Sequence, residues 1–199
     1  MQKVGLPDQY NPNDTIAVLA WVGISRDFDG GLQLLQGGWG ALYLSSSTFV
    51  YYVWRELYLE NTEFISLVEL GDEVHISVHM VDKSSGIARI YIWVPGKGIN
   101  TVKDYILNET GRDIKYVHYI VETPFNITAN EYARLPSFNT IRLGNISIVL
   151  SNGYAYYVTR GSSLINLGYC IKEILMQGNY VNANMSSTLI LKSVFVKIR

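Results

Sequence analysis

The chain has 199 residues, a length that suits a β-sandwich folded as one unit, so we predict a single domain over residues 1–199. Apolar residues make up 48% of the chain and charged residues 17%, which supports a sizeable core and excludes an intrinsically disordered chain. The formal net charge is -1 and basic residues are scattered, so nothing favours nucleic acid or an anionic membrane surface as a partner.

Strand signals dominate, because β-branched and aromatic residues alternate with polar ones between clusters of turn-forming residues. The pattern is clearest from Val74 to Met80, where every second residue is apolar and would face the same way. In chain order we predict strands at 17–24, 31–36, 48–59, 74–80, 86–94, 114–122, 140–150, 154–159 and 188–198. Only the runs 102–107 and 164–176 could hold a short helix.

Short connections separate these strands, and the runs 95–98 and 151–153 are typical of hairpin turns rather than of interdomain linkers. Many short strands at close spacing favour antiparallel pairing over alternating β and α units. We therefore predict an all-β fold, an antiparallel two-sheet β-sandwich. Trp39 and Trp93 are assigned to its core.

The sequence also bears on where the protein acts. The longest strongly apolar run, 16–24, is about half of the roughly 20 residues that cross a bilayer, so we expect no membrane span. The single cysteine, Cys170, excludes an internal disulfide. No secretory signal is visible, but we expect a secreted protein because Asn-x-Ser/Thr acceptor tripeptides begin at several asparagines. These are Asn13, Asn108, Asn126, Asn145 and Asn184.

Three segments far apart in the chain carry a recognisable pattern. A Trp-Val-Gly-Ile run begins at Trp21, and Gln36 lies fifteen positions after that tryptophan. A Trp-Arg-Glu-Leu-Tyr run begins at Trp54, and a Tyr-Ile-Val-Glu run ends at Glu122. In order and spacing these segments resemble the signature of the glutamic peptidase (eqolisin) family, in which a Trp-Val-Gly-Ile strand precedes the catalytic glutamine by fifteen residues.

The resemblance covers about residues 18–150, and it includes a Gly-Asp turn at 71–72 and a Ser-Gly hairpin at 85–86. There are departures from the family pattern. Leu57 and Leu59 replace its Trp and Pro, and Ser25 and Gly40 stand where Asp is usual. These departures bear on substrate preference more than on the chemistry.

The resemblance implies a concanavalin A/lectin-like sandwich and an endopeptidase that hydrolyses protein or peptide substrates in acid, with no cofactor and no metal. We expect it to act as a monomer. The residues to which the resemblance gives a role are the catalytic Gln36 and Glu122, the substrate-binding Glu56, Tyr58, Trp54 and Trp21, and Asp27 as a further carboxylate near the site.

The residue types themselves suit peptide hydrolysis, which needs a base for water and donors for the developing oxyanion. A glutamate with an unperturbed pKa of about 4.3 is a base at acidic pH, where histidine would be protonated. The amide of Gln36 does not titrate, so it donates a hydrogen bond at any acidity. We therefore expect Glu122 to act as general base and then general acid, and Gln36 to hold the oxyanion.

Two other functions stay open at this point. A non-catalytic lectin-like sandwich would bind carbohydrate or peptide in a groove lined by aromatic side chains. An acid carbohydrase would need two carboxylates beside the sugar bond, and Glu56 and Glu122 are available for that. His118 shares a strand face with Glu122, and it either borders the cleft or is a surface histidine.

Metal binding has little support in the sequence. His75 and His79 would face the same way on a strand, but no third ligand is indicated, so solvated histidines are expected. The run 27–31 resembles a calcium loop without its later bidentate glutamate, which favours a plain turn.

Overall fold

The structure is a computed structural model that describes residues 5–6, 14–28, 31–44, 48–58, 60, 62–107, 113–114, 116–126, 131–134, 136, 146–149, 155–158 and 193–197. Apart from the short 3-10 helix η1 (Pro95–Lys97), the elements in these residues are strands. They are β1 (Ala17–Phe28), β2 (Gly31–Leu44), β3 (Thr48–Leu57), β4 (Glu63–Val68), β5 (His75–Asp82), β6 (Ile87–Val94), β7 (Ile99–Ile106), β8 (Tyr116–Glu122), β9 (Phe125–Asn126), β10 (Glu131–Tyr132), β11 (Ile146–Val149), β12 (Ala155–Val158) and β13 (Ser193–Lys197).

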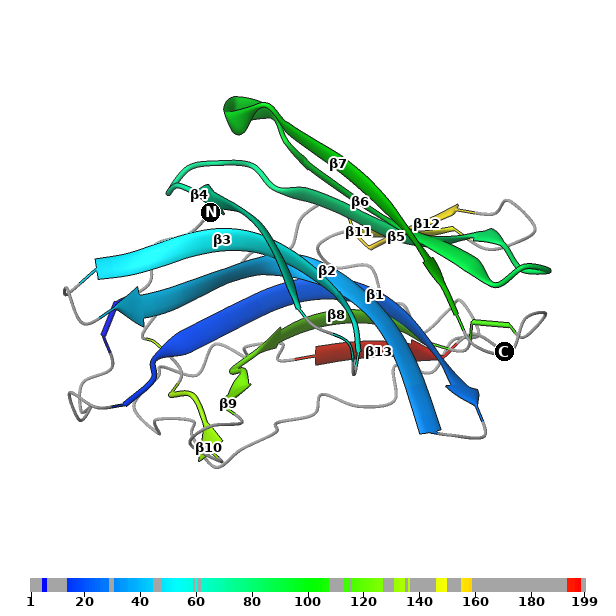
Figure 1. Cartoon of the computed structure of the whole chain (residues 1–199), viewed down its shortest axis with the longest axis horizontal. Helices are drawn as coiled ribbons and strands as arrows, with labels where there is room; N and C mark the ends of the chain where they lie inside the picture. The colour runs from blue at the N-terminus through cyan, green and yellow to red at the C-terminus, as the bar shows by residue number, and fades with distance from the viewer. Residues whose placement is uncertain are drawn as a thin grey trace.

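The strands form two main antiparallel sheets. The large sheet has the order β13-β8-β1-β2-β3-β4, and the small sheet has the order β5-β6-β7. Strands β9 and β10 pair with each other, as do β11 and β12. Figure 1 shows the small sheet lying over the outer side of the bend in β1, β2 and β3. The predicted all-β, antiparallel two-sheet sandwich is confirmed.

The main hydrophobic core lies between the two sheets. It joins fully buried residues of the large sheet to fully buried residues of the small sheet, among them Val18, Leu35, Val53, Ile90 and Ile92. A second, smaller cluster contains Trp21, Leu34, Trp54 and Ile120. Because successive side chains of a strand point to opposite faces, this second cluster lies on the face of the large sheet that is turned away from the main core.

Two glycines of β2 allow aromatic side chains to lie close to this second face. A Cβ atom on Gly38 would stand 2.2 Å from the backbone oxygen of Ala20. A Cβ atom on Gly40 would stand 2.5 Å from the ring of Tyr52. Real Cβ atoms do not approach other atoms that closely, so both positions need glycine. At these positions β2 has no side chain between the aromatic residues of β1 and β3.

Most predicted strands are found, with shifted ends. Strands β1 and β2 run on to Phe28 and Leu44, beyond the predicted ends at residues 24 and 36. Strands β11, β12 and β13 lie within the predicted runs 140–150, 154–159 and 188–198, and the rest of those runs lies outside the described residues. The turn at 95–98 is confirmed as η1 followed by Gly98 in the left-handed region, with φ of 65°. The run 164–176, which could hold a helix, and the turn at 151–153 lie outside the described residues.

The expectation that 102–107 could hold a helix is wrong, because this run belongs to β7 and pairs with β6 along its whole length. Val102, Tyr105 and Ile106 have helical spacing, but pairing puts Tyr105 in the core and leaves Val102 and Ile106 exposed. Sheet pairing and burial thus override the local pattern. Strand β4 was not predicted, since only Val68 of its six residues is buried and the alternation is weak.

Trp93 is also assigned wrongly to the core, whereas Trp39 is buried there as expected. Trp93 is 39% exposed on the outer face of the small sheet. Its ring stacks on that of His75, its partner in the β5–β6 register, with 4.7 Å between the centroids. One face of an antiparallel sheet can be exposed to water, so the stacked rings of His75 and Trp93 need not be buried.

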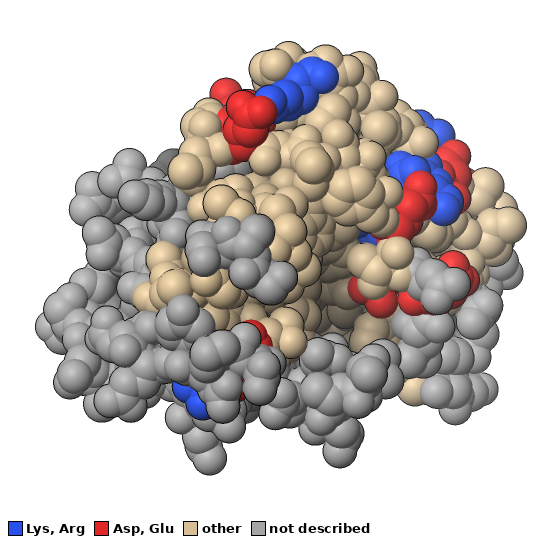
Figure 2. Space-filling model, turned by 60° about the vertical axis from the view of Figure 1, so that its left-hand side comes forward, with Lys and Arg blue, Asp and Glu red and all other residues tan. Residues whose placement is uncertain are grey.

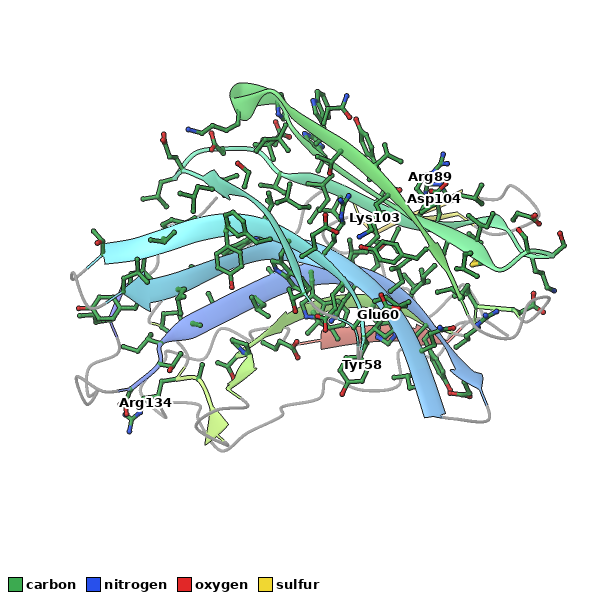
Figure 3. The ribbon with its side chains drawn as sticks, viewed as in Figure 1. Tyr58, Glu60, Arg89, Lys103, Asp104 and Arg134 are labelled. Carbon is green, nitrogen blue, oxygen red and sulfur yellow. The ribbon has the colours of Figure 1, made fainter. Side chains whose placement is uncertain are left out.

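An ion-pair network connects the two sheets. The guanidinium of the buried Arg55 donates two hydrogen bonds to Glu63, at 3.0 and 2.7 Å, and one to the hydroxyl of Thr101 at 3.5 Å. Lys103 of β7, labelled in Figure 3, donates to the same Glu63 at 2.7 Å. Hydrogen bonds from Arg55 and Lys103 lower the pKa of Glu63 to about 2. The network therefore stays charged in moderately acidic solution.

We expect Glu63→Gln to lower the free energy of unfolding by roughly 1–2 kcal/mol at neutral pH, because it leaves the buried Arg55 without its anion. The pKa of Glu63 is depressed by folding, so its contribution is complete above the unfolded pKa of about 4.3 and is lost as pH falls through about 2. Urea unfolding of both proteins from pH 7 to pH 2 measures the difference. If the difference in free energy of unfolding between the two proteins did not shrink as the pH falls, the contribution assigned to the ionised Glu63 would be contradicted. The control is Glu73→Gln, because Glu73 is exposed on a turn.

Candidate active site

Strand register brings the predicted residues onto one face of the large sheet. Gln36 of β2 pairs with Glu56 of β3. Two strands away, Glu122 of β8 pairs with Leu19 of β1, in the row next to Trp21. Directly paired residues of antiparallel strands project to the same side, so all of these side chains lie on the face opposite the main core.

Gln36 is held by one hydrogen bond within this face. Its Nε2 donates to Oε2 of Glu56 at 3.1 Å, and the side chain is buried, with 6% of the residue exposed. Its Oε1 is buried and has no hydrogen-bond partner among the described residues. One amide N–H and the carbonyl oxygen of Gln36 thus make no hydrogen bond among the described residues, since a carboxamide has two donors and one acceptor oxygen and only the bond to Glu56 is formed.

Glu122 is held by the indole of Trp21, whose Nε1 donates to Oε1 of the carboxylate at 2.9 Å. Burial raises the pKa of Glu122 and outweighs the opposing effect of the Trp21 hydrogen bond. The negative charge of Glu56 raises it further. Glu56 is therefore close enough for its charge to influence the protonation of Glu122.

Glu56 is the second carboxylate of the site. Burial raises its pKa, while hydrogen bonds from Gln36 and Thr62 act in the opposite direction. A buried glutamate that keeps its proton above the usual range is common among acid–base catalysts, although structural carboxylates also show such shifts. Together with Glu122 it gives the face two carboxyl groups whose pKa values are raised by burial.

The two tryptophans form the floor beside these groups. Trp21 and Trp54 belong to the buried cluster on this face, and Gly38 of β2 lies between them in the strand register. The Trp54 side chain is buried, and its Nε1 has no hydrogen-bond partner among the described residues. The site thus contains a buried indole donor in addition to the amide of Gln36.

Two predicted residues lie at the margin. Tyr58 is in the turn after β3 and is 48% exposed, and Figure 3 shows it beside Glu60, beyond the end of that strand. Asp27 is on the same face as Trp21 but six positions along β1, near the turn to β2, and it is exposed. The contacts described above therefore connect Gln36, Glu56, Glu122 and Trp21, with Trp54 packed beside them, and do not include Tyr58 or Asp27.

A buried pair on this face was missed by the sequence reasoning. The Oγ of Ser25 lies 2.6 Å from Nε2 of His118, and the two residues are only 1% and 4% exposed. The interpretation of His118 as a surface histidine is therefore wrong. Burial lowers the pKa of His118 to about 4, so the imidazole is neutral above that pH. The ring centroid of His118 lies 5.9 Å from that of Trp21, so Ser25 and His118 lie next to the indole that holds Glu122.

Strand alternation had placed His118 on the face of Glu122, but nothing in the sequence paired it with Ser25 across β1 and β8. The outer face of the small sheet carries His75 and His79, far from these groups in the fold. No group of three or more His, Cys, Asp or Glu side chains that could hold a metal occurs among the described residues. Within the same part of the chain, no helix has the length and apolar character needed to cross a membrane.

Figure 2 shows one face of the molecule with acidic and basic side chains next to one another and a hollow near its centre. The outer face of the small sheet has the same mixed character, since Arg89 donates two hydrogen bonds to Asp104, at 2.6 and 2.8 Å (Figure 3). The described surface thus has neighbouring charges of both signs. This agrees with the near-neutral net charge of the sequence.

Comparisons with known proteins agree with the fold. The fold is a two-sheet antiparallel sandwich, and Gln36, Glu56 and Glu122, which the resemblance to the glutamic peptidases indicated, lie on one face of its large sheet. The Peptidase A4 family model matches residues 1–188. The chain therefore belongs to the Peptidase A4 family and is a glutamic endopeptidase, a hydrolase of peptide bonds.

Solved structures with this fold include aspergilloglutamic peptidase from Aspergillus niger, with a TM-score of 0.57 and 17% sequence identity over 92% of this chain and 99% of that chain. Scytalido-glutamic peptidase with a transition state analog inhibitor is similar at 16% identity, over 79% of this chain and 90% of that chain, with a TM-score of 0.37. No curated protein matches the chain. Family membership favours a peptidase over the two other functions that the sequence left open.

Proposed function

We propose that Glu122 and Gln36 are the catalytic pair and that they hydrolyse peptide bonds in acid by direct attack of water. The observation that carries the proposal is the arrangement on one sheet face of two hydrogen-bonded pairs, Gln36 with Glu56 and Trp21 with Glu122. Gln36 and Glu122 are each held by a hydrogen bond with a neighbouring side chain, and each has a second polar atom that can take part in the reaction. Such support by second residues is what catalytic geometry requires.

In this mechanism Oε1 of Glu122 stays bonded to Trp21, and Oε2 takes a proton from the attacking water. The carbonyl oxygen of Gln36 orients that water, and its second N–H donates to the oxyanion that forms on the substrate carbonyl. Glu122 then returns the proton to the leaving amine. Neither a covalent intermediate nor a cofactor is needed.

The wider proposal is one peptidase domain over residues 1–199 that acts as a secreted monomer on protein or peptide substrates. The family match over residues 1–188 supports a single domain. The acceptor tripeptides in the sequence support secretion.

The experiment that tests the catalytic pair compares the wild-type protein with Glu122→Gln on denatured casein from pH 2 to pH 8. We expect peptide release by the wild type in acid and almost none by the variant. Equal release by both proteins would overturn the assignment of Glu122. A parallel assay on polysaccharide substrates addresses hydrolysis of sugars by Glu56 and Glu122, and cleavage of glycans without cleavage of casein would overturn the proposal as a whole.

Glu56→Gln is expected to extend activity toward neutral pH. Burial raises the pKa of Glu56, so the group gains its negative charge at a higher pH than it would if it were fully solvated. The ionised Glu56 then lies near the developing oxyanion, and the repulsion between the two negative charges slows the wild-type reaction on the alkaline side. The variant does not ionise there, while its carboxamide oxygen still accepts the hydrogen bond from Gln36.

The measurement is kcat/KM for a fluorogenic peptide across pH 2–8. The alkaline limb of the Glu56→Gln profile should move to higher pH, and an unchanged alkaline limb would contradict the role given to Glu56. Glu73→Gln removes the same charge from an exposed turn and should leave the profile in place.

A further inference from the structure

Apolar side chains continue the site face beyond Trp54 onto the terminal strand β4 of the large sheet. Phe64 pairs with Trp54 across β3 and β4, and Leu67 pairs with Tyr52. Paired residues share a face, so Phe64 and Leu67 lie on the same side of the sheet as Gln36 and Glu56. Each of the two is 57% exposed. This side of the site therefore offers an apolar surface.

Tyr52 connects that surface to the floor of the site. Its ring centroid lies 6.1 Å from that of Phe64, with the planes tilted by 39°. The same ring packs against the buried cluster of Trp21, Leu34, Trp54 and Ile120. It also lies over Gly40, where any Cβ atom would collide with it. Tyr52 is thus held against the site face, and its ring is in tilted contact with that of Phe64.

We propose that Tyr52, Phe64 and Leu67 form a subsite for a bulky apolar side chain of the peptide substrate, about three residues from the bond that is cleaved. This inference rests on the proposed function of Gln36 and Glu122. Strand β4 lies two strands from β2, about 10 Å across the sheet, and Phe64 lies two residues along the strands from the row of Gln36 and Glu56, about 7 Å. The two displacements combine to about 12 Å, which an extended peptide covers in about three to four residues.

A purely structural role does not account for these side chains. The opposite face of β4 supplies Val68, 4% exposed, to the main core and Glu63 to the ion-pair network. The side chains that point to the site face add little to that packing. Exposed apolar residues on an outer strand of a sheet favour aggregation with other chains, which natural proteins usually avoid. Contact with the substrate gives a reason to keep them.

The test uses the double variant Phe64→Thr with Leu67→Thr, because threonine preserves strand propensity at two exposed positions. Wild type and variant digest a mixture of unfolded proteins in acid, and mass spectrometry maps the cleaved bonds. We expect wild-type sites to be enriched in Phe, Tyr, Leu or Met at one position about three residues from the cleaved bond. The variant should lose about ten-fold in that preference while still cleaving.

The matched control is Val102→Thr with Ile106→Thr, which removes two exposed apolar side chains from β7 of the small sheet and should leave the preference unchanged. Phe64→Tyr should retain the preference. A second readout combines the double variant with Glu122→Gln and measures binding of a labelled peptide by fluorescence anisotropy. The double variant should bind the apolar peptide about ten-fold more weakly than Glu122→Gln alone.

The outcomes separate this inference from the proposed function. Cleavage by both proteins with identical preferences, or equal peptide affinity in the Glu122→Gln background, would overturn the subsite and leave the catalytic pair intact. Failure of the wild type to cleave any unfolded protein would overturn the proposed function, and the subsite with it. Loss of preference in the control variant as well would show a general effect of surface change and would also overturn the subsite.

Discussion

Replacing Glu122 by Gln should lower kcat/KM for peptide cleavage by roughly 10³-fold or more, because the variant has no base to take the proton of the attacking water. The substitution keeps the size of the side chain and an oxygen that accepts the hydrogen bond from Trp21. The drop should appear at every pH at which the wild type is active. The measurement is initial rate against peptide concentration for both proteins.

Stability provides the control for this result. Folding raises the pKa of Glu122 by burial, so the ionised group opposes folding, and this cost grows as pH rises through the unfolded pKa to the higher folded one. The neutral variant avoids that cost and should unfold at the same or a higher temperature at neutral pH. A variant that loses activity together with a large fall in Tm would point to a structural role, and retained activity would end the assignment of Glu122 as base.

The sequence predicted the fold well because alternation of apolar and polar residues is a local signal of strands. It failed where a strand is determined by its neighbours. Strand β7 looks helical by spacing and becomes a strand through its pairing with β6, and β4 has a single buried residue to mark it. Trp93 shows the same limit, since composition cannot tell which face of a sheet an aromatic residue will occupy.

For the site, the sequence predicted the residue types, while their shared face and the partners of each side chain follow from strand register. The resemblance to glutamic peptidases indicated Gln36, Glu56 and Glu122, and strand alternation put His118 on the face of Glu122. The hydrogen bond between Ser25 and His118 depends on which strands are neighbours, which no local pattern encodes. Likewise, the exposed Phe64 is placed for the proposed contact with substrate only because β4 pairs with β3.

Replacing Gln36 by Ala should lower kcat/KM by about 10²–10³-fold, the usual effect of removing one oxyanion donor. The wild-type amide donates one N–H to Glu56 and has a second for the substrate, and its carbonyl oxygen has no other partner among the described residues. Both contributions are lost in the variant. The amide does not titrate, so the loss should be present from strongly acidic to neutral solution.

The same substitution should change the pH profile in a definite direction. The hydrogen bond from Gln36 lowers the pKa of Glu56, so removing it raises that pKa further. Glu56 then ionises at higher pH, and the alkaline limb of the residual activity should move to higher pH. Gln33→Ala is the matched control, because Gln33 is equally buried on β2 at 6% exposure but projects to the opposite face. A similar loss of activity in that variant would show that a cavity in β2, rather than a missing oxyanion donor, slows the reaction.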